Sequence, residues 1–203
     1  RVQVVIHPDD RELYAEAAQG FAPPPPVQGG ETRQASVLAG LAALEPERPT
    51  QVLIHDAARP FASPALVARA IEAARTTGAA IPALRIADTV KTVDADGRIA
   101  GTADRDTLRF VQTPQAFAFG PLLAVHRKAA QAGRDEFTDD AALMEWGGHP
   151  VFTFEGESGN FKLTTPEDFM RAETMLHDRL SDVRAGMGFD VHEFGPGDHV
   201  TLG

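Results

Sequence analysis

The fold is decided by the stretch Val52-Leu53-Ile54-His55-Asp56-Ala57-Ala58-Arg59-Pro60. Its apolar half does not alternate with polar residues, which is typical of a strand covered on both faces, as in a parallel sheet. Ligands of such sheets bind beyond the carboxyl ends of the strands, where Asp56 and Arg59 are expected. The stretch also fits a plain strand end followed by a turn with a solvated ion pair, so both interpretations stay open here.

The composition limits the partners and the compartment. The 203 residues include 29 acidic and 19 basic side chains, which gives a net charge of −10. This balance argues against nucleic acid and anionic membranes as partners, although a few focused cations could still bind a small anion. The chain has no cysteine, so we expect a cytoplasmic protein without disulfides or thiolate metal sites. No apolar run approaches the roughly 20 residues of a membrane span.

Strands and helices are expected to alternate around this central stretch. Residues 2–6 and 79–84 are apolar runs typical of strands. Helical spacing of apolar residues over 37–44 predicts one helix, and Ser63-Pro64 predicts the start of another that ends near Thr77. A strand–helix–strand–helix–strand order implies parallel strands with right-handed crossovers. We therefore predict an α/β fold with a Rossmann-like, mostly parallel sheet and helices on both faces.

The pattern changes after the third strand. Residues 88–94 alternate between polar and apolar side chains, Asp96-Gly97 is a turn signal, and residues 99–102 continue on the return side. We interpret residues 86–112 as a protruding β-hairpin arm. Because a two-stranded arm cannot bury both faces alone, we expect it to pack on a second copy of the chain in a homodimer.

Two places carry residues suited to phosphate. Gly29-Gly30 precedes a helix, whose first N–H groups and dipole favour anions. Arg33 and Ser36 lie three residues apart, so both could face one phosphate, although an ordinary loop-to-helix junction looks the same. A lone lysine is usually solvated, but Lys162 lies between a loop and the start of a threonine-capped helix, a position that also suits contact with a phosphate.

Two acidic positions leave alternatives open. Asp139 and Asp140 could be paired catalytic carboxylates, but they also suit the first turn of a helix that Thr138 caps. Asp190 and His192 are two residues apart, so on a strand they point the same way. Such a pair can supply two ligands of a zinc-type site, or its spacing can be incidental.

Several motifs occur in an order that resembles one enzyme family. They are Gly29-Gly30-Glu31-x-Arg33-x-x-Ser36-Val37, His55-Asp56-Ala57-Ala58-Arg59-Pro60, Asp88-Thr89-Val90-Lys91, Arg105 with Gln112-Thr113-Pro114-Gln115, Thr138-Asp139-Asp140 and Asn160-Phe161-Lys162-Leu163-Thr164. Over about residues 1–178 the chain resembles the 2-C-methyl-D-erythritol 4-phosphate cytidylyltransferase family of isoprenoid precursor synthesis. The tail Arg184-x-Gly186-x-Gly188-Phe189-Asp190-Val191-His192-x-Phe194 is similar to the start of 2-C-methyl-D-erythritol 2,4-cyclodiphosphate synthase. Together they resemble the bifunctional fusion of some bacteria.

The resemblance implies transfer of CMP from CTP to methylerythritol phosphate, with release of pyrophosphate and with Mg²⁺ as cofactor. It assigns to CTP and magnesium the residues Gly30, Glu31, Ser36, Asp56 and Ala57. It assigns to the methylerythritol phosphate pocket the residues Arg59, Thr89, Thr113, Thr138 and Lys162. Arg105 and Lys162 would be the catalytic pair that positions the phosphate nucleophile, and Arg105 and Thr89 would reach the site of the other subunit.

The resemblance also implies a domain organisation. Residues 1–180 would form the cytidylyltransferase domain. Residues 181–203 would begin an α+β cyclodiphosphate synthase domain, in which Asp190 and His192 bind Zn²⁺ or another divalent cation and CMP is released. The family's glycine-rich nucleotide loop precedes the strand at residues 2–6. We therefore expect roughly fifty residues before Arg1, an estimate from the length of a βα unit, and an inactive piece without them.

Two other functions stay open at this point. A nucleotidyltransferase that acts on another sugar or polyol phosphate would share the nucleotide motifs and differ in the acceptor pocket. A non-catalytic dimerisation module would keep the arm and lack the glycine-rich loop upstream.

Overall fold

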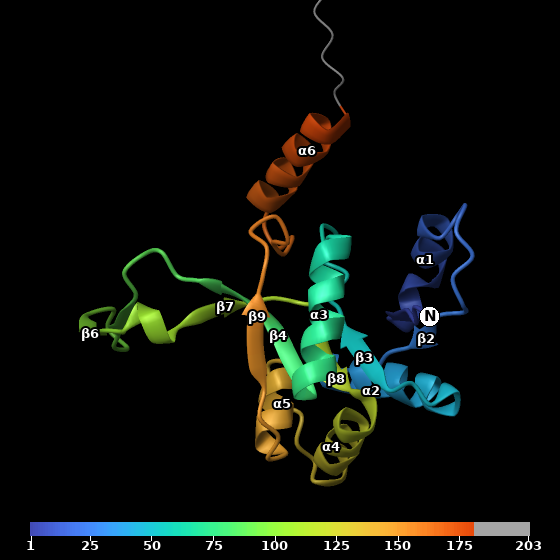
Figure 1. Ribbon diagram of the computed structural model, residues 1–203. Helices are drawn as coiled ribbons and strands as arrows, with labels where there is room; N and C mark the ends of the chain where they lie inside the picture. The colour runs from blue at the N-terminus through green and yellow to red at the C-terminus, as the bar shows by residue number, and fades with distance from the viewer. Residues whose placement is uncertain (181–203) are drawn as a thin grey trace, which may run out of the picture. The chain divides into compact units, whose positions relative to one another are not determined.

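A computed structural model of the chain describes residues 1–180 (Figure 1), and the chain divides into two units between Thr164 and Thr165. The first unit holds the sheet, the arm and the candidate site. Its main sheet has five strands: β3 (Gln51–Ile54), β4 (Ala79–Arg85), β7 (Arg109–Val111), β8 (Gln115–Ala118) and β9 (Phe152–Glu155). The α/β class is as predicted.

The prediction of a mostly parallel sheet is wrong. Strand β8 lies between β3 and β4 and is antiparallel to both, and β7 is also antiparallel to β4. Among the described strands of this main sheet, only β4 and β9 pair in parallel. The reason lies in the chain path: the return from the arm brings β7 and β8 back beside β4 without a crossover helix, so they run against it. Strands β3, β4 and β9 still run in one direction.

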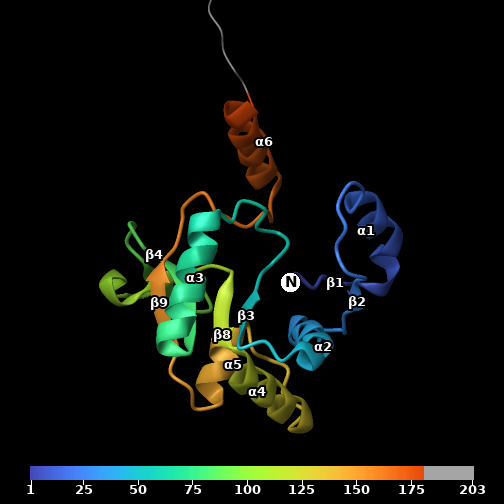
Figure 2. The same cartoon turned by 45° about the vertical axis from the view of Figure 1, so that its right-hand side comes forward.

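Helices cover both faces of this sheet, as predicted (Figure 2). On one face α3 (Pro64–Thr77) packs on Leu53 and Ala116. The opposite face carries the larger apolar cluster, in which Val52 and Phe117 meet three other helices. These helices are α2 (Arg33–Leu44), α4 (Phe119–Gln131) and α5 (Asp140–Trp146). The alternation of 52 with 53 and of 116 with 117 divides the strand residues between the two faces.

The N-terminal strand is shorter than expected and lies outside the main sheet. Strand β1 (Val5–Ile6) pairs in parallel with β2 (Val27–Gln28), which the sequence analysis did not identify. The 3₁₀ turn Pro8–Asp10 and helix α1 (Arg11–Ala17) connect the two strands. Strand β1 lies close to α2, because a Cβ on Gly40 of that helix would come within 2.9 Å of the Val5 side chain.

The arm is present where it was predicted. Strands β5 (Lys91–Val93) and β6 (Ile99–Thr102) form an antiparallel hairpin that leaves the main sheet at the end of β4 (Figure 1). Gly97 adopts a φ of 80° in its turn, a conformation that glycine takes without strain. A short 3₁₀ turn over Arg105–Thr107 then leads into β7.

The second unit begins with α6 (Pro166–Leu180). Its start is the threonine cap that the sequence predicted. The Asp168 N–H donates to Thr165 Oγ1 at 3.3 Å, and the Thr165 N–H donates to Asp168 Oδ2 at 2.9 Å. This is a reciprocal capping arrangement. Within residues 1–180, no helix has the length and apolar character needed to cross a membrane.

Candidate active site

The loop after β3 is closed by a ring of hydrogen bonds. The Arg59 N–H donates to the Asp56 carbonyl at 3.0 Å, which makes residues 56–59 a turn. His55 Nε2 lies 3.0 Å from the Arg59 carbonyl and His55 Nδ1 lies 2.9 Å from Thr113 Oγ1. A carbonyl only accepts, so the proton is assigned to Nε2, and the Thr113 hydroxyl then donates to Nδ1. The same hydroxyl accepts from the Asp56 N–H at 3.1 Å.

The loop that carries Lys162 is bound to this turn. Asn160, which is fully buried, donates from Nδ2 to the Thr113 carbonyl at 2.7 Å. Arg59 Nη1 donates to the Asn160 carbonyl at 2.9 Å, and the Leu163 N–H donates to the Ala58 carbonyl at 2.8 Å. Three motifs far apart in the sequence therefore meet at one end of β3. We call Asp56, Arg59, Thr113 and Lys162 the Asp56 rim.

Asp56 lies between two cations. Arg33 Nε donates to Asp56 Oδ1 at 3.3 Å, and Lys162 Nζ lies 3.2 Å from Asp56 Oδ2. Burial by itself would raise the pKa of Asp56, but Arg33 and Lys162 together outweigh it and hold the pKa below its ordinary value of 3.8. The carboxylate is therefore ionised at neutral pH.

Arg59 is a cation of a different kind. Within residues 1–180 no carboxylate forms an ion pair with it. Its guanidinium donates to two main-chain carbonyls, those of Asn160 and Val111, and its Nε is buried without a partner among the described residues. Burial lowers the pKa of Arg59, and the attraction of Asp56 only partly opposes this. A half-buried guanidinium without a bound carboxylate is suited to bind an anion.

The two acids at the start of α5 have structural roles. Asp139 is the N-cap, since its Oδ1 accepts from the Ala142 N–H at 2.8 Å; the prediction that Thr138 caps this helix is off by one residue. Asp139 Oδ2 accepts from Gln115 at 2.8 Å. Asp140 is 1% exposed and accepts from His126 and from Arg33. All four carboxylate oxygens therefore have partners within the fold, which argues against a pair of catalytic carboxylates.

Arg33 and Ser36, in the first turn of α2, bind different partners and not one common ligand site as the sequence allowed. Arg33 turns to Asp56 and Asp140, whereas Ser36 Oγ accepts from the Gly30 N–H at 3.2 Å. These two side chains thus have separate partners and do not jointly face a phosphate. The glycine pair has a steric reason as well: a Cβ on Gly29 would lie 2.7 Å from Ser36 Oγ, and one on Gly30 would lie 2.6 Å from Ala35 Cβ.

Several other predicted site residues are exposed. Ala57 lies within the turn of residues 56–59, and Glu31 and Thr138 precede α2 and α5. Thr89 and Arg105 are exposed on the arm, where Arg105 donates to the Ala87 carbonyl. Their roles in a binding site stay predictions. Asp190 and His192 lie outside the described residues.

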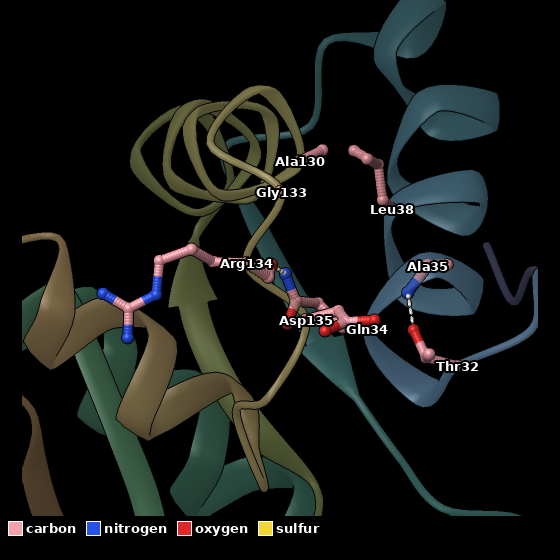
Figure 3. A pocket seen from close by; sticks show the side chains of 8 residues that line it. All are labelled: Thr32, Gln34, Ala35, Leu38, Ala130, Gly133, Arg134 and Asp135. Carbon is pink, nitrogen blue, oxygen red and sulfur yellow. Dashed lines mark hydrogen bonds between the residues drawn. The ribbon is translucent and has the colours of Figure 1, made fainter.

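A cavity of about 200 Å³ lies at the junction of α2 and the end of α4 (Figure 3). It is lined by Thr32, Gln34, Ala35, Leu38, Ala130, Gly133, Arg134 and Asp135. The Arg134 side chain points away from it, and Gln34 Nε2 donates to the Arg134 carbonyl at 2.8 Å. No residue of the Asp56 rim lines this cavity, so we base the site on the rim and its hydrogen bonds.

The partners of Arg33 were not predicted from the sequence. Asp140 and His126 come from α5 and α4, far from Arg33 in the sequence. The acids at 139 and 140 were singled out, but nothing in the local pattern indicates that one caps a helix and the other pairs with an arginine. Asn160 and Gln112 were quoted only within motifs. The structure shows that Gln112 Nε2 donates to the Glu157 and Asn160 carbonyls at 2.8 and 3.0 Å.

Comparison with known proteins gives a consistent result. The family model for 2-C-methyl-D-erythritol 4-phosphate cytidylyltransferase matches residues 1–178. Relatives from Nitrobacter hamburgensis and Rhodopseudomonas palustris, each named "Bifunctional enzyme IspD/IspF", are 59% and 56% identical over 201 residues, which is 99% of this chain. The chain spans 50% of the length of each.

Solved structures give the same picture. The cytidylyltransferase of Thermus thermophilus has a TM-score of 0.72 at 38% identity, over 86% of this chain and 81% of that one. The 4-diphosphocytidyl-2C-methyl-D-erythritol synthase of Anaerococcus prevotii has a TM-score of 0.78 at 36% identity, over 87% and 81%. The bifunctional IspDF of Campylobacter jejuni has a TM-score of 0.65 at 27% identity, over 83% of this chain and 41% of that one.

Proposed function

The chain belongs to the 2-C-methyl-D-erythritol 4-phosphate cytidylyltransferase family, and we propose from this premise that the protein transfers CMP from CTP to 2-C-methyl-D-erythritol 4-phosphate. A phosphate oxygen of the acceptor attacks the α-phosphorus of CTP. One P–O bond forms, the bond to the leaving pyrophosphate breaks, and 4-diphosphocytidyl-2-C-methylerythritol results. Such a transfer requires alignment of the two substrates and neutralisation of phosphate charge, with little covalent chemistry from the protein.

The observation that carries the proposal is the state of Arg59. Its guanidinium is held by carbonyls beside Lys162, and burial lowers its pKa, so a substrate phosphate would supply the anionic partner that the described fold does not. Lys162 lies 3.2 Å from Asp56, within reach of the same anion. We assign both cations to the acceptor phosphate. Thr113 holds the loop on which Arg59 lies and completes the wall of this pocket.

The nucleotide side of the site consists of Gly30, Glu31, Ser36, Asp56 and Ala57 in this proposal. Asp56 fits a magnesium ion, because Mg²⁺ in nucleotide enzymes is often held by one or two carboxylates together with substrate phosphates. Among the residues that the structure describes, no group of three or more His, Cys, Asp or Glu side chains is placed to hold a metal ion. When bound, the ion would neutralise charge on the phosphates.

The arm completes the site of a second subunit in this proposal. Arg105 and Thr89 are exposed and lie on the segment that leaves the sheet. In a dimer formed through the arm, they would reach the acceptor pocket of the other subunit, where Arg105 and Lys162 would position the attacking phosphate. Thr138 lies near the start of α5 and would line the same pocket.

The full-length protein would carry a second activity. Relatives of twice this length are named bifunctional, and residues 181–203 contain the Asp190 and His192 motif. We propose that this pair ligates Zn²⁺ or another divalent cation in a domain that forms 2-C-methyl-D-erythritol 2,4-cyclodiphosphate with release of CMP. The cytoplasm remains the predicted compartment.

Pyrophosphate release from CTP tests the first activity directly. We expect the full-length protein to release pyrophosphate with methylerythritol phosphate and Mg²⁺, and to do so at least tenfold less efficiently with other polyol phosphates. Lys162→Met should abolish the reaction. The control Lys128→Met should not, because Lys128 lies over the Trp146 ring on the surface of α4. Preference for another polyol phosphate would correct the substrate; no turnover with any acceptor would favour a dimerisation module.

Mixing two inactive variants tests the arm. Arg105→Ala should impair turnover without destroying the dimer, and so should Lys162→Met. If the arm acts in the other subunit's site, a mixed dimer has one complete site. The mixture should then recover about a quarter of wild-type activity when subunits pair at random. A mixture that stays as inactive as its components would show that Arg105 acts within its own subunit or not at all.

A further inference from the structure

A buried chain of polar contacts connects the core to the Asp56 rim. His126 Nε2 donates to Asp140 Oδ1 at 2.9 Å, and Arg33 Nη1 donates to Asp140 Oδ2 at 2.7 Å. The same guanidinium then reaches Asp56 through Nε at 3.3 Å. The members come from α4, α5, α2 and the loop after β3, so the fold brings four separate elements to one line of contacts. We call Arg33, Asp140 and His126 the brace.

Burying the charged side chains of the brace costs free energy, so stability alone does not account for them. Asp140 is 1% exposed and His126 is 0% exposed. Replacing a buried ion pair by apolar residues is often neutral or stabilising, so such a pair is weak evidence of a stability role. His126 adds to this cost, because its Nδ1 is buried without a partner among the described residues. The neutral ring with the proton on Nε2 leaves only a lone pair unsatisfied there.

The geometry gives the brace a task at the rim. The guanidinium is rigid and planar, so fixing Nη1 on Asp140 also fixes the direction of Nε. Nε in turn fixes Oδ1 of Asp56 and leaves Oδ2 toward Lys162. Without Asp140, Arg33 would keep only its contact with Asp56, and the direction of its guanidinium would be fixed at one point instead of two.

We propose that His126 and Asp140 are positioning residues of the cytidylyl transfer, which hold Arg33 and, through it, the carboxylate of Asp56 in the orientation that the substrates meet. This inference rests on the function proposed above. Neither residue touches substrate. Each acts through a contact that the structure shows, and the effect ends at Asp56.

Three substitutions in the full-length protein separate this role from simple packing. His126→Leu removes the donor to Asp140, whereas His126→Gln keeps an amide N–H near the position of Nε2. Leu122→Val is the matched control, since Leu122 is 0% exposed on the same helix and belongs to the apolar core. We expect kcat/KM to fall about 10- to 100-fold for Leu, the usual effect of losing such a supporting contact. Gln and the control should stay within about threefold of wild type.

The decisive test combines His126→Leu with Asp56→Asn. If His126 acts through Asp56, the Leu substitution should lower kcat/KM no further in the Asp56→Asn background. Multiplying losses would overturn the proposal, and so would an equal loss in Leu122→Val. If His126→Leu prevents folding, Asp140→Asn takes the place of His126→Leu in the same double-mutant cycle with Asp56→Asn, because asparagine has nearly the size of aspartate.

A readout without turnover keeps this test separate from the proposed function. The Nε–H proton of Arg33, bonded to Asp56, should exchange slowly with water in NMR spectra. We expect His126→Leu to speed that exchange at least tenfold and Leu122→Val to leave it unchanged. An unchanged exchange rate in His126→Leu would contradict the positioning role of His126 even if the enzyme is active. Faster exchange in a protein that transfers no CMP would instead contradict the proposed function and support the contact of His126 and Asp140 with Arg33.

Discussion

The Asp56 rim and the β-arm both present charged side chains, but the fold supports them in opposite ways. In the rim, Asp56 has a partner on each oxygen, and the loop behind it is closed through Thr113 and Asn160. In the arm, residues 91–100 are exposed throughout, and Val93 and Ile99 expose 61% and 67% of their surface. Contacts within the subunit therefore hold the rim in place, whereas the arm exposes apolar side chains that the described part of the subunit does not cover.

Under the proposed function, this difference concerns how each charge would be held in place for the substrates. A two-stranded hairpin is marginally stable in water, so in the proposed dimer the second subunit would define the position of Arg105. The rim would need no second subunit for this, because its contacts extend into the core through Asp140 and His126. Substitutions that remove the contacts of Asp56 with the core should therefore lower stability, while substitutions in the arm should leave the stability of the subunit nearly unchanged.

The largest effect should come from Asp140→Ala. The substitution leaves His126 unpaired and Arg33 with one carboxylate instead of two, so we expect the free energy of unfolding to fall by about 3 to 5 kcal/mol. Urea unfolding followed by circular dichroism measures it. Arg105→Ala in the arm is the counterpart and should change stability by less than about 0.5 kcal/mol. A loss below 1 kcal/mol for Asp140→Ala would mean that the contacts of Asp140 with His126 and Arg33 do not stabilise the fold as described.

The two arginines of the site should respond differently to the same substitution. Arg59→Met should lower kcat/KM about 100-fold, or about 2.7 kcal/mol, because the acceptor phosphate loses its guanidinium. Its free energy of unfolding should change by less than about 1 kcal/mol, since only hydrogen bonds to two carbonyls are lost. Arg33→Met loses two carboxylate contacts and should be clearly less stable than Arg59→Met. Equal losses of stability would contradict the distinction between an internally paired arginine and one kept for substrate.

The sequence predicts local features of this molecule better than distant ones. The Ser63 cap, the hairpin of β5 and β6 and the capping of α6 follow from neighbouring residues. The insertion of β8 between β3 and β4 does not, because antiparallel pairing of Gln115–Ala118 depends on a chain reversal that no short pattern encodes. The parallel order was inferred from helices that connect successive strands. This inference gives β3 and β4 the correct common direction, but it does not apply to β8, which follows the arm without a connecting helix.

The candidate site divides in the same way. The motifs around Asp56, Thr113 and Lys162 were expected to meet and do so. The partners of Arg33 could not be chosen from sequence, because any of 29 acidic residues is a possible partner until the fold excludes most of them. The expectation that Arg33 faces a phosphate followed from helical spacing alone, whereas its actual direction is set by Asp140, 107 residues away.

A smaller effect is expected at the arm. Val93→Ser with Ile99→Ser removes apolar surface that the subunit leaves exposed, so the dimer should dissociate about tenfold more readily, or about 1.4 kcal/mol. Sedimentation velocity over a range of concentrations measures this. Ile71→Ser on α3 is the control, since its side chain is also exposed (44%) but lies off the arm. An unchanged dimer in the arm variant, or an equal loss in the control, would place the contact elsewhere.

The smallest effect is a pH dependence of the rim. The pKa of Asp56 lies below 3.8 in the folded protein, because Arg33 and Lys162 outweigh the effect of burial. A carboxyl group whose pKa is lowered on folding stabilises the protein above its unfolded pKa and loses this contribution as the pH falls through the folded value. Wild type should therefore exceed Asp56→Asn in stability by about 1 kcal/mol or less at neutral pH.

That gap should close in acid. Urea midpoints of the two proteins, measured between pH 7 and pH 3, should converge as the pH drops below about 4, because Asp56 is then protonated in the unfolded chain and increasingly in the folded one. Lys162→Met removes one of the two cations, so in its background the gap should be smaller and should close at higher pH. A gap that widens on acidification would mean that the charge on Asp56 is tolerated by the fold for the sake of ligand binding alone. The rim would then resemble the arm, with charges held for a partner that is not part of the chain.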